Sequence, residues 1–160
     1  MAPSTGLLVF LGGSRIQGEA GYTVIDRDEM FDPLLAACPS FGPAWQRFVA
    51  GWQSEEGDPP LYVALSSLCH HVIALRDAGD DDAVRRVFAV VEAWHPDGDA
   101  YVREAATIGF IETLGNILSH DPSGPARLAA LRAFTGPETT RWWRKVDAFW
   151  AGNHRALSDE

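Results

Sequence analysis

Glu92 and His95 are the first residues whose spacing could support chemistry. They are three positions apart, so a helix presents this carboxylate and this imidazole on one face. Bundles that hold two metal ions use two such pairs together with two further glutamates. The sequence has one Glu-x-x-His pair, so we expect no metal ion. We favour a partly cationic His95 in the last turn of a helix, where it meets the negative end of the helix dipole.

Two predicted helices contain further polar candidates. His71 follows Cys69 and His70, and neighbouring side chains on a helix point about 100° apart. The two histidines therefore cannot bind one metal ion together, and Cys69 cannot form a nucleophilic pair with the histidine beside it. We therefore expect His71 to be hydrogen-bonded at the edge of the core. Glu112 and Asn116 are four residues apart on a later, mostly apolar helix. If that helix is central, they are buried polar groups that either fix the packing or mark a pocket.

Aspartates and tryptophans point to binding rather than to catalysis. Trp142 and Trp143 are adjacent, so a helix cannot direct both into one core, and we expect one of them to contact a loop or an outside partner. Two aspartate-rich turns offer negative charge to a basic surface, although such residues are usually solvated helix caps. The candidate partner-binding residues are Asp80, Asp81, Asp82, Asp97, Asp99 and Trp142.

Composition limits the class of protein. The chain has 160 residues, of which 46% are hydrophobic and 22% charged, so we expect one globular domain and exclude collagen, coiled coils and wholly disordered chains. Thirteen Lys and Arg against 22 Asp and Glu give a formal charge of -9. This charge repels nucleic acid and anionic lipid, and it favours a basic protein partner.

Cysteine usage and hydropathy indicate the compartment. Cys38 and Cys69 form no CxxC pair and each lies in an apolar run, which favours buried, reduced thiols and a cytoplasmic protein. The apolar run of residues 7–11 is far shorter than the roughly 20 residues that span a bilayer. We therefore expect no membrane segment. The Gly pair at 12–13 after this run lacks the lysine of a phosphate-binding loop.

The elements that position these residues are predicted to be helices. Apolar residues between 61 and 75 are four, three, four and three positions apart, which is typical of one helical stripe, and Gly79 is placed to cap that helix. We predict an all-α fold, either an irregular multi-helix bundle or a short stack of antiparallel helix pairs. Residues 1–29 are expected to be a flexible extension, 30–152 the helical domain and 153–160 a tail. Predicted helices cover 30–38, 43–53, 61–75, a segment between Asp82 and His95, 99–120, 127–134 and 138–151.

Residues 30–152 resemble an uncharacterised family of small helical bacterial proteins, a domain of unknown function. The likeness lies in Phe41, Trp45, the helix from residue 61, the segment VFAVVEAWHPDGDAYVREAATIGFIETLGN (87–116) and the closing GPETTRWWRKVDAFWAG (136–152). Some similar proteins accompany polymorphic toxins as immunity or accessory factors. The resemblance therefore implies partner binding, and it carries no catalytic residue and no cofactor with it.

Three functions remain open at this stage. We favour an acidic protein-binding domain that could neutralise a basic toxin. The alternative is a metal-dependent or acid-base enzyme with a pocket inside the bundle, and its candidate groups are His71, Glu92, His95, Glu104 and Glu112. A structural subunit of an assembly is the third possibility, and it predicts a large exposed apolar patch.

Overall fold

The structure is a computed structural model that describes residues 23–158. The interpretations of residues 7–13 lie outside the described residues. The described chain is all-α, which confirms the predicted fold class. In chain order the elements are α1 (Phe31–Ala37), the 3-10 helix η1 (Pro39–Phe41), α2 (Gly42–Trp52), α3 (Leu61–Asp77), α4 (Asp81–Asp97), α5 (Ala100–Glu104), the π-helix η2 (Ala105–Glu112), α6 (Thr113–Ser119), α7 (Gly124–Arg132) and α8 (Pro137–Trp150).

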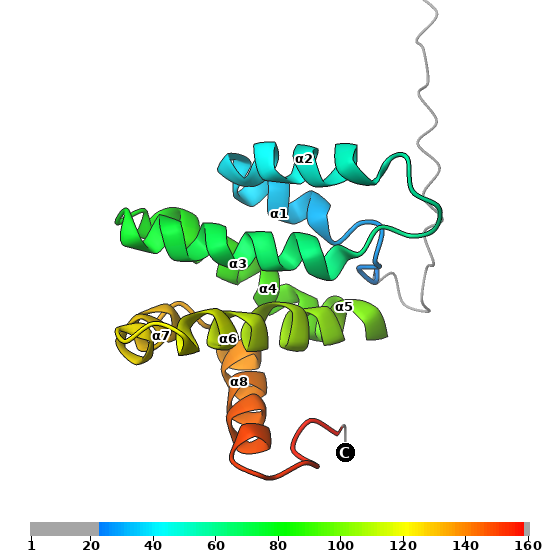
Figure 1. Ribbon diagram of the computed structural model, residues 1–160. Coiled ribbons are helices and arrows are strands. Elements are labelled where there is room, and N and C mark those ends of the chain that lie inside the picture. The colour runs from blue at the N-terminus through cyan, green and yellow to red at the C-terminus, as the bar shows by residue number, and fades with distance from the viewer. Residues whose placement is uncertain (1–22, 159–160) are drawn as a thin grey trace, which may run out of the picture.

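The helices are arranged in layers around α3 and α4 (Figure 1). One side of this central pair is covered by α1 and α2, and the other by the continuous helix formed from α5, η2 and α6. The last helix, α8, crosses that continuous helix steeply and also contacts α4. The arrangement is therefore an irregular multi-helix bundle in which α8 closes one side.

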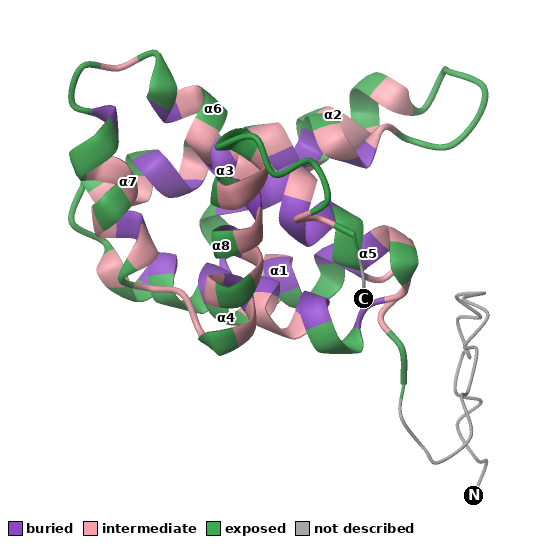
Figure 2. Ribbon diagram, turned by 90° about the horizontal axis from the view of Figure 1, so that it is seen from below, coloured by how far each residue is buried: buried purple, intermediate pink, exposed green. Residues whose placement is uncertain are grey.

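The buried residues lie where the helices of these layers face one another (Figure 2), and they form the core. Large aromatic groups dominate it: Trp94 and Phe110 are inaccessible to solvent, and Phe88 meets the Phe110 ring edge-on at 5.4 Å. Burying each such side chain contributes about 1.5–3 kcal/mol. Because these residues come from α4 and η2, their packing fixes the two helices against each other.

The turn between α3 and α4 forms as the sequence predicts. Gly79 has φ +78°, and its N–H donates to Arg76 O while Asp80 N–H donates to Leu75 O. This Schellman arrangement satisfies the last carbonyl groups of α3. Asp80 then caps α4 by accepting a hydrogen bond from the Ala83 N–H at 3.2 Å.

The helix predicted for residues 99–120 contains an unexpected π-helical stretch, η2. At Gly109 it approaches α3 so closely that an added Cβ would lie 2.5 Å from Leu65 Cδ1. The buried Cys69 thiol of α3 also donates a hydrogen bond to Phe110 O at 3.5 Å. These contacts hold the wider turn in place, and π-helical turns recur near functional sites.

Both ends of the described chain pack further than the sequence suggested. Ile25 pairs with the end of α4, because its N–H donates to Asp97 O at 2.8 Å and its carbonyl accepts from the Asp99 N–H at 2.9 Å. Residues 23–29 are thus attached to the domain, although we expected the whole of 1–29 to be a flexible extension. Leu157, in the expected C-terminal tail, is partly buried against the core.

Helix α4 ends within residues 95–98, where the sequence suggested. The helix includes Pro96 and ends at Asp97, with the Gly98 N–H donating to Trp94 O at 3.1 Å. Among residues 23–158, no helix combines the length and the apolar character needed to cross a membrane.

Candidate functional site

Glu92 holds the start of α8 from the neighbouring α4. Its two carboxylate oxygens accept hydrogen bonds from the backbone N–H groups of Glu138, at 2.7 Å, and Thr139, at 2.9 Å. These N–H groups would otherwise lack partners, because Gly136 provides no side-chain cap. Burial raises the pKa of Glu92, but the hydrogen bonds from Thr139 and Glu138 outweigh it, and the net pKa is lowered. Glu92 is therefore an ionised cap supplied from another helix.

His95 lies one turn further along α4 and is buried, with 4% of its surface exposed. Burial lowers its pKa to about 4; the carboxylates of Glu92 and Glu138 oppose this shift and the Arg141 guanidinium adds to it. The imidazole is therefore neutral at pH 7, so the expected cation at the helix end is wrong. Its ring stacks on Trp142, with centroids 6.1 Å apart and planes 8° apart. Neither ring nitrogen has a hydrogen-bond partner among residues 23–158.

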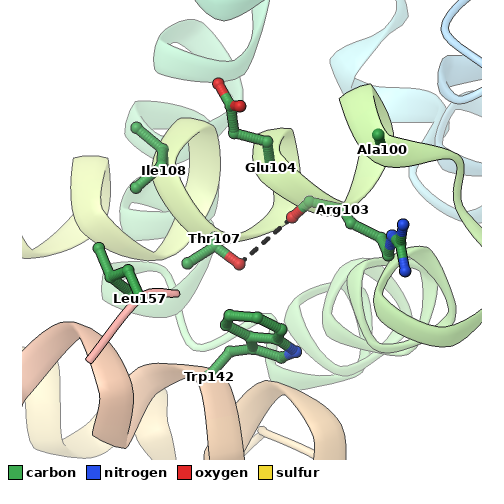
Figure 3. Close-up of a pocket in the computed structure, with 7 residues that line it drawn as sticks. All are labelled: Ala100, Arg103, Glu104, Thr107, Ile108, Trp142 and Leu157. Atoms are coloured by element: carbon green, nitrogen blue, oxygen red, sulfur yellow. Dashed lines mark hydrogen bonds between the residues drawn. The ribbon is translucent and has the colours of Figure 1, made fainter. Parts of the chain in front are cut away.

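Trp142 forms one wall of a hollow of about 400 Å³ (Figure 3). The hollow lies between the α5–η2 segment, α8 and the C-terminal turn. Arg141 and Lys145 lie over the Trp142 ring at 5.2 and 4.3 Å from its centroid. The sequence grouped Trp142 with acidic residues, whereas two cationic side chains lie over its ring, one of them paired with Glu138. The residues that line this Trp142 hollow are Ala100, Arg103, Glu104, Thr107, Ile108, Trp142 and Leu157.

Glu104, a candidate for acid-base chemistry, lines the same hollow. Its carboxylate accepts a hydrogen bond from the Tyr62 hydroxyl at 3.0 Å. The pKa of Tyr62 is raised by burial and by this bond to Glu104. In Figure 3 the Glu104 carboxylate is directed away from Trp142. Glu104 thus links the α5 end to α3 and does not face the interior of the hollow.

A second hollow of about 340 Å³ lies between α6, α7 and α8, and we call it the Trp150 groove. Trp143 is buried at its base, whereas Trp150 at its edge is 63% exposed. The two adjacent tryptophans of α8 therefore line different hollows. The residues that line the groove are Ile111, Glu112, Gly115, Asn116, Ser119, Leu128, Trp143, Val146, Asp147 and Trp150.

Glu112 and Asn116 both line the Trp150 groove, which agrees with their interpretation as pocket residues. We expected both side chains to be buried if their helix were central. Glu112 is half-buried and Asn116 is exposed. No described residue makes a hydrogen bond or an ion pair with the Glu112 carboxylate. Asp147, on the opposite wall, is held by two hydrogen bonds from Arg132 at 2.6 and 2.7 Å. Glu112 is therefore the available charge of the groove.

His71 forms a hydrogen bond, as the sequence predicts. Its Nε2 lies 2.8 Å from Ser40 Oγ, and Ser40 Oγ is in turn 3.4 Å from Cys38 Sγ. Burial lowers the pKa of His71. A nucleophilic triad needs a third group that orients the imidazole, and no hydrogen bond from another described residue reaches His71 Nδ1. The contact instead ties η1 to α3.

The candidate aspartates do not form one surface. Asp80 caps the start of α4 and Asp99 caps α5 by accepting from the Val102 N–H at 2.9 Å. Asp81 pairs with Arg76 at 3.1 Å and Asp82 with Arg85 at 2.7 Å. Asp97 is exposed at the far end of α4. Because α4 has 17 residues, the two groups of aspartates are about 25 Å apart.

The candidates for an enzyme centre also stay apart. Glu92 and His95 meet α8, Glu104 meets Tyr62, Glu112 lies in the Trp150 groove and His71 contacts Ser40. Within residues 23–158, no group of three or more His, Cys, Asp or Glu side chains is placed to hold a metal ion.

Several residues of the two hollows were missed by sequence reasoning. The missed residues are Arg103, Thr107 and Trp150. Each lines a hollow only because α8 packs across η2. The six tryptophans of the sequence were a general indication. The helical period alone could have placed Trp142 on one face of α8 and Trp143 and Trp150, which are seven residues apart, on another.

These features define an all-α domain with two surface hollows on either side of the crossing of η2 and α8. Residues 31–151 match the family described as "Domain of unknown function (DUF7674)", and the chain belongs to this family. The match confirms that residues 30–152 resemble an uncharacterised family. Comparisons with curated proteins and with solved structures gave no significant match.

Proposed function

We propose that the chain is a binding domain that takes a basic partner protein in the Trp150 groove. The observation that carries the proposal is Trp150, whose large side chain is 63% exposed beside a concave surface. Tryptophan is enriched among the residues that dominate the energy of protein interfaces. Burying Trp150 under a partner would recover the hydrophobic free energy that the isolated chain leaves unused.

Charge supports a basic partner. The chain carries a formal charge of -9, which attracts a cationic protein over long distances at low salt. Within the groove, Glu112 is half-buried and no other described residue pairs with it. A lysine or arginine of the partner would form an ion pair with Glu112, while an apolar side chain would pack between Trp143 and Trp150.

We extend this proposal to an immunity-type role in a bacterial cytoplasm, in which the basic partner is a toxin that the chain neutralises. The resemblance to proteins that accompany polymorphic toxins supports this finer statement. The free and buried thiols of Cys38 and Cys69 are consistent with a reducing compartment.

The test is capture of partners from a lysate of the native host, with the full chain as bait at low and at high salt. We expect a basic protein to be retained at low salt by the wild type and by Val63→Ala, which removes an exposed side chain of α3 outside the groove. Trp150→Ala and Glu112→Gln should each weaken its binding at least about tenfold, measured by titration with the purified partner.

Two outcomes contradict the proposal. One is the absence of any partner, and the other is a partner that binds Trp150→Ala as tightly as Val63→Ala. Self-association of the pure chain that Trp150→Ala abolishes would support a structural subunit instead. Conversion of a substrate that Glu112→Gln abolishes would favour an enzyme.

A further inference from the structure

The Trp142 hollow is a second candidate site, and it differs in chemistry from the Trp150 groove. Its volume of about 400 Å³ lies in the range of pockets for small molecules. Figure 3 shows Trp142 at one side, Thr107 opposite it, and Leu157 and Arg103 toward the two ends. Apolar surface thus surrounds a few polar groups, which is typical of small-molecule sites.

Arg103 is the cationic residue among those that line the hollow. Arg103 has no ion pair with any residue from 23 to 158. Lys145 lies 4.3 Å and Arg141 5.2 Å from the centroid of the Trp142 ring, while Glu104 points away toward Tyr62. Neither Lys145 nor Arg141 lines the hollow, and Arg141 pairs with Glu138 at 3.0 Å, so Arg103 is the cation that a ligand in the hollow can reach. A guanidinium group without an ion pair beside apolar walls favours an anionic ligand.

The walls are held rigidly. Trp142 stacks on the buried His95 ring, so its position is fixed from behind. Thr107 and Ile108 belong to the π-helix η2, and the Thr107 hydroxyl donates to Arg103 O at 3.2 Å. This hydroxyl oxygen keeps its lone pairs as acceptors. A rare helix type at the wall of a hollow is a second observation that points to a site.

We propose that the Trp142 hollow binds a small carboxylate with an apolar body. The guanidinium group of Arg103 pairs with the carboxylate through two parallel N–H···O bonds, a geometry that arginine provides and lysine does not. The apolar body packs against Trp142, Ile108 and Leu157. Binding here is independent of the partner proposed for the Trp150 groove.

The experiment titrates the full chain with benzoate, 2-naphthoate and hexanoate, and with the neutral amide of each. Binding is measured by calorimetry and by the NMR resonance of the Trp142 indole N–H, which Trp142→Phe assigns. We expect at least one carboxylate to shift this resonance and to bind at least tenfold more tightly than its amide. Arg103→Gln should remove this preference, because the amide and the carboxylate then meet the same neutral group.

The matched control is Arg144→Gln, which removes the same charge from an exposed position of α8 outside the hollow. It should bind the carboxylate as the wild type does, and so should Trp150→Ala, which separates this test from that of the groove. The proposal is overturned if none of the three carboxylates shifts the Trp142 resonance. Equal affinity in Arg103→Gln and Arg144→Gln overturns it as well.

Discussion

At the scale of single residues, Glu92 and His95 show how one helical spacing leads to two roles. Both lie on the face of α4 that meets α8, as three-residue spacing requires. Glu92 reaches two backbone N–H groups and stays ionised, whereas His95 is enclosed by the Trp142 ring and stays neutral. The difference arises from what each side chain touches on α8, and the sequence of α4 does not contain that information.

The buried His95 makes stability dependent on pH. Its pKa is about 4 in the folded chain and about 6.5 in the unfolded chain, so the unfolded state binds more protons below pH 6.5. The contribution of neutral, buried His95 to the free energy of unfolding is therefore fully present above about pH 6.5. It falls by about 3 kcal/mol as the pH drops to 4. Urea unfolding at a series of pH values measures this loss.

The variant His95→Phe keeps an aromatic ring against Trp142 and removes the titration. We expect it to lose much less stability than the wild type between pH 6.5 and 4. The control His70→Gln removes an exposed imidazole of α3 and should follow the wild-type curve. Parallel curves for His95→Phe and the wild type would show that protonation of His95 does not drive the loss.

At the scale of elements, the sequence predicts most of the helices but little of how they pack against one another. The positions of α3 and α4 follow from the apolar period, from Gly79 and from Asp80, because these signals act within a few residues. The π-helix η2 was not predicted, since it depends on Leu65 and Cys69 of another helix. The hollows were likewise missed, because each needs the crossing angle of α8.

Glu92→Gln tests the cap that α4 gives to α8. An amide replaces one accepting oxygen by an NH₂ group that faces a backbone N–H, so one charge-assisted hydrogen bond is lost. We expect a loss of about 1.5–3 kcal/mol of unfolding free energy. Glu112→Gln makes the same chemical change where no described partner exists, and it should change stability by less than about 0.5 kcal/mol. Equal losses in both variants would contradict the cap.

Two glycines of the continuous helix test the contact that accompanies η2. An added Cβ at Gly109 would lie 2.5 Å from Leu65 Cδ1, whereas at Gly115 nothing lies within 4 Å. We expect Gly109→Ala to lose about 1–3 kcal/mol through overpacking and Gly115→Ala to gain about 0.5–1 kcal/mol through helix propensity. Thermal and urea unfolding measure both. A stabilised Gly109→Ala would mean that the helices separate at no cost.

At the scale of the whole molecule, charge and shape divide the two proposed sites. The chain as a whole is acidic, and the Trp150 groove shares that character through Glu112, whereas its Asp147 is paired with Arg132. The Trp142 hollow, on the other side of the same crossing, offers Arg103, which has no ion pair among residues 23–158. One helix, α8, therefore presents adjacent tryptophans to two hollows whose charged residues left unpaired by the described chain, Arg103 and Glu112, have opposite signs, so a partner and a small anion need not compete.

The limits of the folded unit give a prediction for the molecule as a whole. The family match begins at residue 31, yet Ile25 makes two backbone hydrogen bonds at the end of α4. Arg27 adds a hydrogen bond to Pro59 O at 2.6 Å and lies 4.9 Å from the centre of the Tyr101 ring. A chain that starts at residue 30 should thus be about 2–4 kcal/mol less stable than one that starts at residue 23. Urea unfolding of the two purified chains decides this, and equal midpoints with equal slopes would place the edge of the cooperative unit at Met30.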